Sequence, residues 1–238
     1  MTNLVRPVLA IVAASAVAAA LVAAQPPSPP PRDLAQPVLI ELFQSQGCSS
    51  CPPALGVLAE EASRHDIVAL NFAVTYWDQL GWKDIYAKPE FTARQWDYAR
   101  AGGRSNVATP QLIVAGRQAV LGSRKNEVDR AINAARRADG PSLSASPGHL
   151  LVGKASARGA ATVWVADYDP RTIAVPISAG ENGGRTLPHR NIVKRLTAIG
   201  VWRGGAAKFP LPPIAPGLVR AAFVQVGKGG PVIAARTL

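Results

Sequence analysis

The two cysteines of the chain, Cys48 and Cys51, form a single Cys-x-x-Cys motif. An apolar run at residues 37–43 precedes the motif, and a helical pattern at residues 54–65 follows it. A Cys-x-x-Cys between a strand and a helix is typical of a redox-active dithiol. Backbone amides at a helix start stabilise a thiolate, which is the nucleophile in disulfide exchange. We therefore expect Cys48 to be the attacking thiol and Cys51 the resolving thiol.

Two prolines, Pro52 and Pro53, follow the motif directly. Proline lacks an N–H group and is tolerated in a helix only in the first turn. The pattern therefore predicts a helix that begins at about Ser49 or Ser50, with Cys48 at or just before its N-terminus.

Other interpretations of the two cysteines are a static disulfide, half of a zinc site, or a soft-metal site for an ion such as Cu(I). Zinc needs about four ligands, and the chain offers only three histidines, His65, His149 and His189. The sole methionine is the initiator, which argues against a Cu(I) site. A disulfide across so short a loop constrains the unfolded chain little. We expect neither a metal nor an organic cofactor.

The N-terminus has the pattern of an export signal. Residues 1–24 combine Arg6 with an uncharged Ala/Val/Leu run and small residues before Gln25, which predicts a cleaved signal peptide. An uncleaved anchor is the alternative, because the run nearly reaches the ~20 residues of a spanning helix. Residues 25–36 form a Pro-rich spacer. We expect a periplasmic or secreted protein with no stable membrane span after cleavage, in a compartment where disulfides persist.

The net charge of +11 is unevenly distributed. Residues 25–140 carry 13 Lys/Arg and 12 Asp/Glu, whereas residues 141–238 carry 12 Lys/Arg and three Asp/Glu. The basic part could contact an anionic envelope component. The alternative is a solvated basic face, because the positive residues are scattered. No nucleic-acid partner is expected for an exported chain without such a motif.

Residues 37–140 predict the order strand, helix, strand, helix, strand, strand, helix. The strands are expected near residues 37–43, 67–75, 111–115 and 118–121, and Thr109-Pro110 opens the third. With a Cys-x-x-Cys after the first strand, this α/β arrangement (βαβαββα) resembles the thioredoxin fold, in which that proline is cis and packs beside the dithiol. An ordinary trans bond is the alternative.

The strand order brings three distant segments to one sheet edge: the dithiol, Thr109-Pro110, and an aromatic-rich connection at residues 76–86. We expect a substrate-binding wall there, formed by Tyr76, Trp77, Trp82, Thr109 and Pro110. The alternative is a loop packed on its own aromatic core. Asp78 or Asp84 could accept a proton from the thiols; alternatively, either could pair with Lys83 or cap the turn.

Residues 141–238 predict a second, mainly β domain, sandwich-like and packed on the first. Strands are expected at residues 161–167, 218–226 and 231–236. Within it, His189 and Arg190 could meet an anion or lie over the dithiol. Alternatively, His189 hydrogen-bonds its loop and Arg190 pairs with an acid of the first domain.

A closer resemblance is to a family of secreted bacterial thioredoxin-like proteins known as domain of unknown function 1223. It rests on five stretches that span nearly all of the expected mature chain: residues 41–54, 76–84, 91–100, 109–114 and 181–194. The resemblance implies a fold and a redox site, but no established reaction or substrate.

The leading functional hypothesis is an exported thiol–disulfide oxidoreductase that exchanges disulfides with a protein or small-thiol partner through Cys48 and Cys51. The competing hypothesis is a non-enzymatic envelope binding module with a structural disulfide and a basic β domain. A soft-metal handler is the third.

Overall fold

A computed structural model of the chain describes residues 1–2, 36–135, 140–156 and 159–238. Residues 3–24 of the expected signal peptide and all but the last residue of the spacer, residues 25–36, lie outside the described residues, so both stay predictions. Within the described part, no helix is long and apolar enough to cross a membrane. The described chain from residue 36 to the C-terminus lies in one compact unit.

The first half of this unit contains its three α-helices and four of its strands. In chain order these are β1 (Val38–Gln44), α1 (Pro52–Glu61), β2 (Ile67–Ala73), the 3₁₀ turn η1 (Asp78–Leu80), α2 (Pro89–Ala101), β3 (Gln111–Val114), β4 (Gln118–Leu121) and α3 (Lys125–Ala134). Proline occupies the first turn of both α1 and α2, where its missing N–H leaves no intrahelical bond unmade.

The second half is all β in its described residues. Its strands are β5 (Leu143–Ser146), β6 (His149–Val152), β7 (Ala161–Asp169), β8 (Ile173–Pro176), β9 (Thr186–His189), β10 (Ile192–Trp202), β11 (Ala207–Pro210), β12 (Val219–Val226) and β13 (Val232–Thr237). Strands β11, β6 and β5 form a small sheet, and β8 pairs with β9 as a two-stranded hairpin.

The two halves share one mixed sheet of eight strands, in the order β13-β12-β7-β10-β2-β1-β3-β4. Strand β2 runs parallel to β1 on one side and parallel to β10 on the other, where Asn71 pairs with Ile192. Every residue of β2 is buried. The sheet edge that β2 would otherwise expose is therefore covered by the second half of the chain.

The expectation of an α/β thioredoxin-like domain (βαβαββα) over residues 37–140 with a separate, sandwich-like β domain over residues 141–238 is wrong. The described chain is mostly β, with one large mixed sheet and three α-helices. The error has a physical cause. Strand pairing between Asn71 and Ile192 joins residues far apart in sequence, which hydrophobic periodicity within each half cannot reveal.

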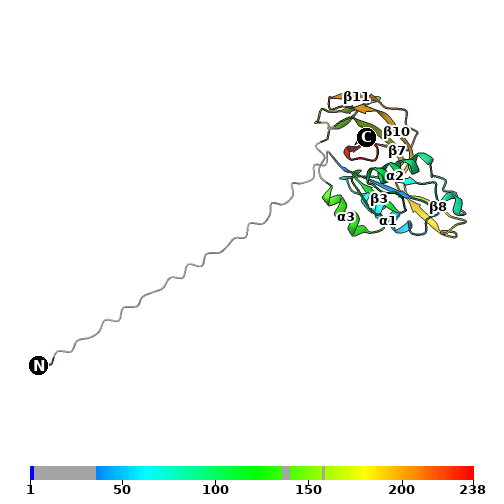
Figure 1. Ribbon diagram of the computed structural model, residues 1–238, viewed down its shortest axis with the longest axis horizontal. Coiled ribbons are helices and arrows are strands. Elements are labelled where there is room, and N and C mark those ends of the chain that lie inside the picture. The colour runs from blue at the N-terminus through cyan, green and yellow to red at the C-terminus, as the bar shows by residue number, and fades with distance from the viewer. Residues whose placement is uncertain (3–35, 136–139, 157–158) are drawn as a thin grey trace. The chain divides into compact units, whose positions relative to one another are not determined.

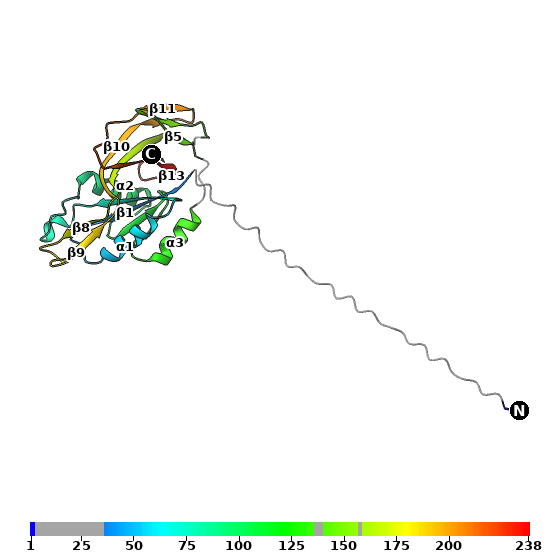
Figure 2. The same cartoon turned by 180° about the vertical axis from the view of Figure 1, so that it is seen from behind.

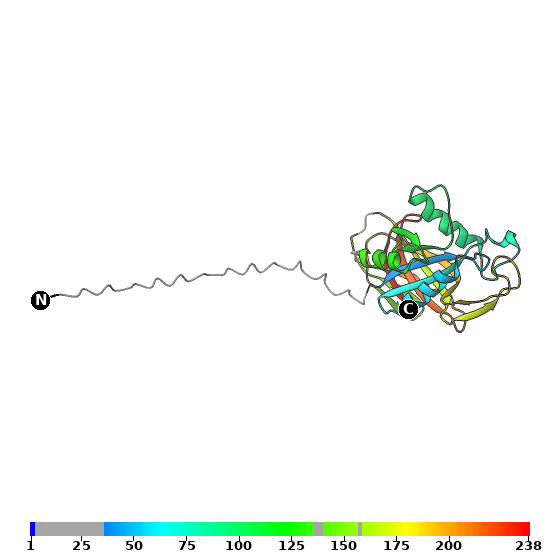
Figure 3. The same cartoon turned by 90° about the horizontal axis from the view of Figure 1, so that it is seen from below.

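The core has layers on both faces of the large sheet (Figures 1 and 2). Helices α1 and α3 lie on one side, away from β11, and Figure 3 views the molecule from that side. There Leu58 and Ile132 pack with Ile40 and Leu42. On the other face the first half contributes Phe43, Phe72 and Phe91, and the second half contributes Tyr168 and Phe223. The main core is thus built jointly by both halves.

A buried ion pair lies inside this shared core. Glu41 of β1 is fully buried. Its carboxylate accepts two hydrogen bonds from Arg94 of α2, at 2.6 and 3.0 Å, and another from the Tyr98 hydroxyl. Gln225 of β12 bonds both Arg94 and Tyr98. The pair is therefore neutralised and hydrogen-bonded by groups from both halves.

Candidate functional site

Cys48 and Cys51 are joined by a disulfide in the turn between β1 and α1, with their Cα atoms 5.4 Å apart. Both residues have an exposed fraction of 0%. Helix α1 begins at Pro52 with Cys51 at its N-cap, later than the predicted start at Ser49 or Ser50. Cys48 therefore precedes the helix by one turn, closed by a hydrogen bond from the Cys51 amide to the Cys48 carbonyl of 3.1 Å.

The middle of the motif is its only exposed part, since Ser49 and Ser50 are exposed while both cysteines are buried. The Ser50 hydroxyl lies 3.3 Å from the sulfur of Cys48. A hydroxyl at this distance can donate to a thiolate, which favours the charged form of Cys48.

The aromatic connection lies against this turn. Trp82 donates from its indole N–H to the side-chain oxygen of Gln46, at 2.9 Å, two residues before Cys48. Trp77 donates to the hydroxyl of Thr109, at 2.8 Å. Tyr76 and Trp77 also pack against the main core, as expected of a packed loop. The bonds to Gln46 and Thr109 place the same connection beside the dithiol turn, as expected of a binding wall.

The Thr109-Pro110 bond is cis, as predicted. Antiparallel pairing of β1 with β3 places Gln111 opposite Phe43. Pro110 therefore lies beside the end of β1, where the chain continues towards Cys48. Pro110 is buried.

Asp84 is the ionisable group that contacts the segment before Cys48. It is 2% exposed, and its carboxylate accepts the amide N–H groups of Gln46 and Tyr86, each at 2.8 Å. Burial raises the pKa of Asp84 to about 6, despite these hydrogen bonds. Asp78 instead accepts the amide of Asp84, at 3.1 Å, which is the turn-capping role that was its alternative.

A segment from the second half of the chain covers the motif. Residues 177–185, which connect β8 to β9 and which we call the cap turn, place Asn182 against it. The Asn182 side-chain amide, fully buried, donates to the carbonyls of Gln46 and Cys48, each at 2.9 Å. The Glu181 carboxylate accepts the amide of Ser49, at 3.0 Å. Hydrogen bonding to the Ser49 side chain and backbone lowers the pKa of Glu181.

The cap turn is shaped by glycines. Gly180 and Gly184 have φ values of +74° and +80°, which L residues rarely adopt. A Cβ on Gly180 would lie 3.1 Å from the Cβ of Trp82. The sequence pattern did not identify Glu181, Asn182 or Gln46 as residues of the site. The only local signal was Asn182 before two glycines.

His189 lies in the interior of the protein, away from the dithiol. It is fully buried on β9, with its ring 6.3 Å from that of Tyr86, and neither ring nitrogen has a hydrogen-bond partner among the described residues. Burial lowers the pKa of His189 to about 4, so the ring is neutral near pH 7. No described contact joins His189 to the dithiol.

Arg190 binds the end of α1. Its guanidinium donates to the Ala59 carbonyl at 3.2 Å and the Ser63 hydroxyl at 2.9 Å. In these bonds it contacts neither an anion nor an acid; it donates to one carbonyl and one hydroxyl near the C-terminus of α1.

The described residues contain no cluster of three or more His, Cys, Asp or Glu side chains that could hold a metal ion. The arrangement that is present is a buried disulfide, a hydroxyl beside one sulfur, a buried carboxyl behind the turn, and a cap from the other half of the chain.

Comparisons with known proteins agree with the resemblance found in the sequence. Residues 39–225 match the family described as Protein of unknown function (DUF1223). A crystal structure of a protein from Agrobacterium tumefaciens is similar with a TM-score of 0.72 and 30% identity, covering 84% of this chain and 93% of that one. The comparison with curated proteins finds no match.

A second solved structure, HBP35 of Porphyromonas gingivalis, has a TM-score of 0.56 and 13% identity, covering 85% of this chain and 74% of that one. At this identity the likeness concerns the fold alone.

Proposed function

The chain belongs to the DUF1223 family of proteins of unknown function, and we propose that it is an exported thiol–disulfide exchange protein that reacts through Cys48 and Cys51. The observation that carries the proposal is the disulfide between these residues in the turn before α1. It closes a loop with a sequence separation of three, so it constrains the unfolded chain little. A bond with so little structural benefit is better explained by chemistry.

The surroundings of Cys48 support its role as the reacting sulfur. The Ser50 hydroxyl at 3.3 Å stabilises a thiolate on Cys48, and Ser49 and Ser50 bring the motif to the surface, although both sulfurs are buried. Asp84 is a positioning residue, because its carboxylate holds the amide of Gln46 in the segment that leads to Cys48.

The proposed reaction is a pair of exchange steps. A substrate thiolate attacks the sulfur of Cys48, the Cys48–Cys51 bond breaks, and the Cys51 thiolate leaves and takes up a proton. A second substrate thiolate then attacks the substrate sulfur of the mixed disulfide, and the Cys48 thiolate leaves. Two electrons pass from the substrate, which becomes a disulfide, to the protein, which becomes a dithiol; reversal of the steps oxidises the protein.

Access to the buried sulfurs requires movement of the cap turn. Both cysteines are 0% exposed, and Asn182 holds the carbonyls on either side of Gly47. We infer that the cap turn opens before exchange, and that a thiol- or disulfide-bearing protein or small thiol then reaches Cys48. The predicted signal peptide supports a periplasmic or secreted location, where the disulfide state persists.

The test compares two single-cysteine variants. Reduced Cys51→Ser and Cys48→Ser proteins are mixed with glutathione disulfide at pH 7, and the mixed disulfide is followed by intact mass. We expect Cys51→Ser to form a glutathione adduct at Cys48 at least about tenfold faster than Cys48→Ser forms one at Cys51. Failure of both folded variants to form an adduct, or equal rates in the two, contradicts the proposal.

A further inference from the structure

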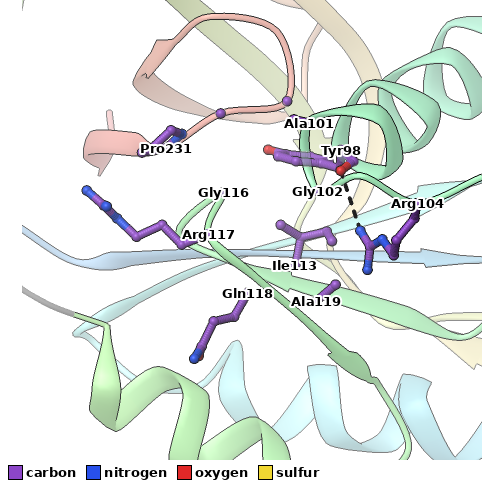
Figure 4. Close-up of a pocket in the computed structure, with 12 residues that line it drawn as sticks. Tyr98, Ala101, Gly102, Arg104, Ile113, Gly116, Arg117, Gln118, Ala119 and Pro231 are labelled. Carbon is purple, nitrogen blue, oxygen red and sulfur yellow. Dashed lines mark hydrogen bonds between the residues drawn. The ribbon is translucent and has the colours of Figure 1, made fainter. Parts of the chain in front are cut away.

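A cavity lies at the opposite end of β3 from the disulfide. Strand β3 begins beside the end of β1, and the turn that follows it, residues 115–117, forms one wall of a cavity of about 420 Å³. The end of α2 and the turn between β12 and β13 form the other walls (Figure 4). This volume lies in the usual range for small-molecule sites.

The charged side chains that line the cavity are both positive. They are Arg104, just after α2, and Arg117, in the β3–β4 turn, and no acidic side chain joins them in the lining. Neither arginine forms an ion pair among the described residues. The cavity therefore has an uncompensated positive potential, which favours an anion.

Arg104 has unmet hydrogen-bonding capacity. Its Nε–H is buried and has no acceptor in the described part of the chain, and its Nη2 donates to the Tyr98 carbonyl at a long 3.5 Å. A buried donor on a cation without an acceptor is unfavourable. Because this Nε–H is itself buried, a ligand oxygen would pair with the outer guanidinium nitrogens and give Arg104 the charge-assisted partner that it lacks.

The rest of the lining is largely apolar. Figure 4 shows Ile113 and Ala119 between the two arginines, with Tyr98 and Pro231 on the opposite wall. A ligand that fits this lining needs a short apolar body as well as an anionic group.

The walls are held in place without a ligand. The Val232 amide donates to the Ala115 carbonyl at 2.9 Å, which joins the two turns. A Cβ on Gly116 would collide with the Gly230 carbonyl oxygen, so the close approach of these turns depends on that glycine. The Tyr98 hydroxyl is fixed by Gln225 at 3.1 Å within the buried ion-pair cluster. Such preorganisation lowers the entropic cost of binding.

We propose that this cavity binds a small organic carboxylate, with its oxygens on Arg104 and its alkyl part over Ile113 and Ala119. A guanidinium pairs with a planar carboxylate through two parallel hydrogen bonds, which adds geometric specificity. Arg117 is exposed and lies on the other side of Ile113 from Arg104. It would bind a second anionic group in ligands that carry one.

The experiment titrates the full chain with sodium hexanoate, sodium adipate, hexylamine and sodium sulfate, with amide chemical shifts as the readout at constant ionic strength. We expect saturable shifts at residues 113–119 with hexanoate and adipate only, and weaker hexanoate binding by at least about tenfold in Arg104→Gln. Arg117→Gln should weaken adipate more than hexanoate. Arg203→Gln, which removes an exposed arginine elsewhere, should leave both affinities unchanged.

A fourth variant keeps the test independent of the charge changes. Ala119→Leu retains both arginines but fills the apolar floor, so hexanoate binding should be lost while the unfolding midpoint of the protein stays near that of the wild type. Sulfate that binds as tightly as hexanoate, binding unaffected by Arg104→Gln, or absence of binding by both carboxylates overturns the proposal.

Discussion

Asn182 is the residue that we expect to control access to the disulfide. Its buried side chain satisfies the carbonyls of Gln46 and Cys48, and the Arg185 guanidinium holds its oxygen at 2.7 Å. A single side chain from the second half of the chain therefore holds the backbone around the motif.

We expect Asn182→Ala to expose the disulfide more often. Loss of its bonds leaves buried carbonyls without donors and destabilises the closed cap turn by about 1–3 kcal/mol. Every 1.4 kcal/mol is about a tenfold change in an equilibrium, so reduction by dithiothreitol should be at least about fivefold faster in the variant. Intact mass after quenching measures the rate. Asn106→Ala, at an exposed position, is the control, and equal rates in all three proteins contradict the gating role.

Asp84 and His189 should give opposite dependences of stability on pH. The pKa of His189 is about 4 in the fold against 6.5 ordinarily, so the unfolded chain binds the extra proton and stability increases from pH 4 to 6.5. The pKa of Asp84 is about 6 against 3.8, so the folded chain holds the proton longer and stability decreases from pH 3.8 to 6. Each effect is on the order of 3 kcal/mol, so they largely cancel in the wild type.

Substitution of one group should reveal the other. The free energy of unfolding of His189→Phe should fall as pH rises from 4 to 6, and that of Asp84→Asn should rise over the same interval. Urea unfolding at several pH values measures both slopes. Slopes of the same sign in the two variants contradict these pKa assignments.

At the scale of elements, local sequence predicted much of what forms. The apolar, β-branched runs near residues 37–43 and 67–75 are strands β1 and β2, and the run at 161–167 lies in β7. These signals are local, because all of β2 and most positions of β1 and β7 are buried, and buried positions favour apolar residues. The start of α1 was less accurate, because two prolines allow the preceding residues to form a separate turn.

Glycines in the β12–β13 turn fix how this turn packs on α2. Gly227 and Gly229 have φ values of +65° and +64°, but only Gly229 meets another backbone, at the Asp97 carbonyl. Gly227→Ala should cost about 1–2 kcal/mol, the penalty of a positive φ. Gly229→Ala should cost about 1–3 kcal/mol more because its Cβ collides with Asp97. Equal losses in urea unfolding would contradict the close approach.

At the scale of the whole molecule, the sequence could not reveal that the two halves form one sheet. Residue composition changes near residue 141, and that change predicted a boundary. The two halves instead share one sheet because of long-range contacts: Asn71 pairs with Ile192, and Asn191 donates to the Ala69 carbonyl at 2.9 Å. Likewise, the buried position of Glu41 in an apolar run is explained by its ion pair with Arg94, which lies far from it in the sequence.

The buried pair should therefore govern the stability of the whole unit. Glu41→Gln or Arg94→Met alone leaves an uncompensated buried group and should cost about 3–5 kcal/mol in a single transition that both halves share. The double variant should lose less than the sum of the two, because neither charge remains. Intrinsic fluorescence and far-UV circular dichroism follow the transition. Two separate transitions in the wild type contradict the shared core.

The reduction potential of the Cys48–Cys51 disulfide decides whether this bond can take part in thiol–disulfide exchange. The wild-type protein is equilibrated with glutathione or dithiothreitol buffers of known potential, and the dithiol fraction is measured by alkylation and mass. An exchange protein should show a reversible two-electron transition above about −300 mV, the level below which structural disulfides fall. A disulfide that stays oxidised below that potential, or that reduces only when the protein unfolds, contradicts the account.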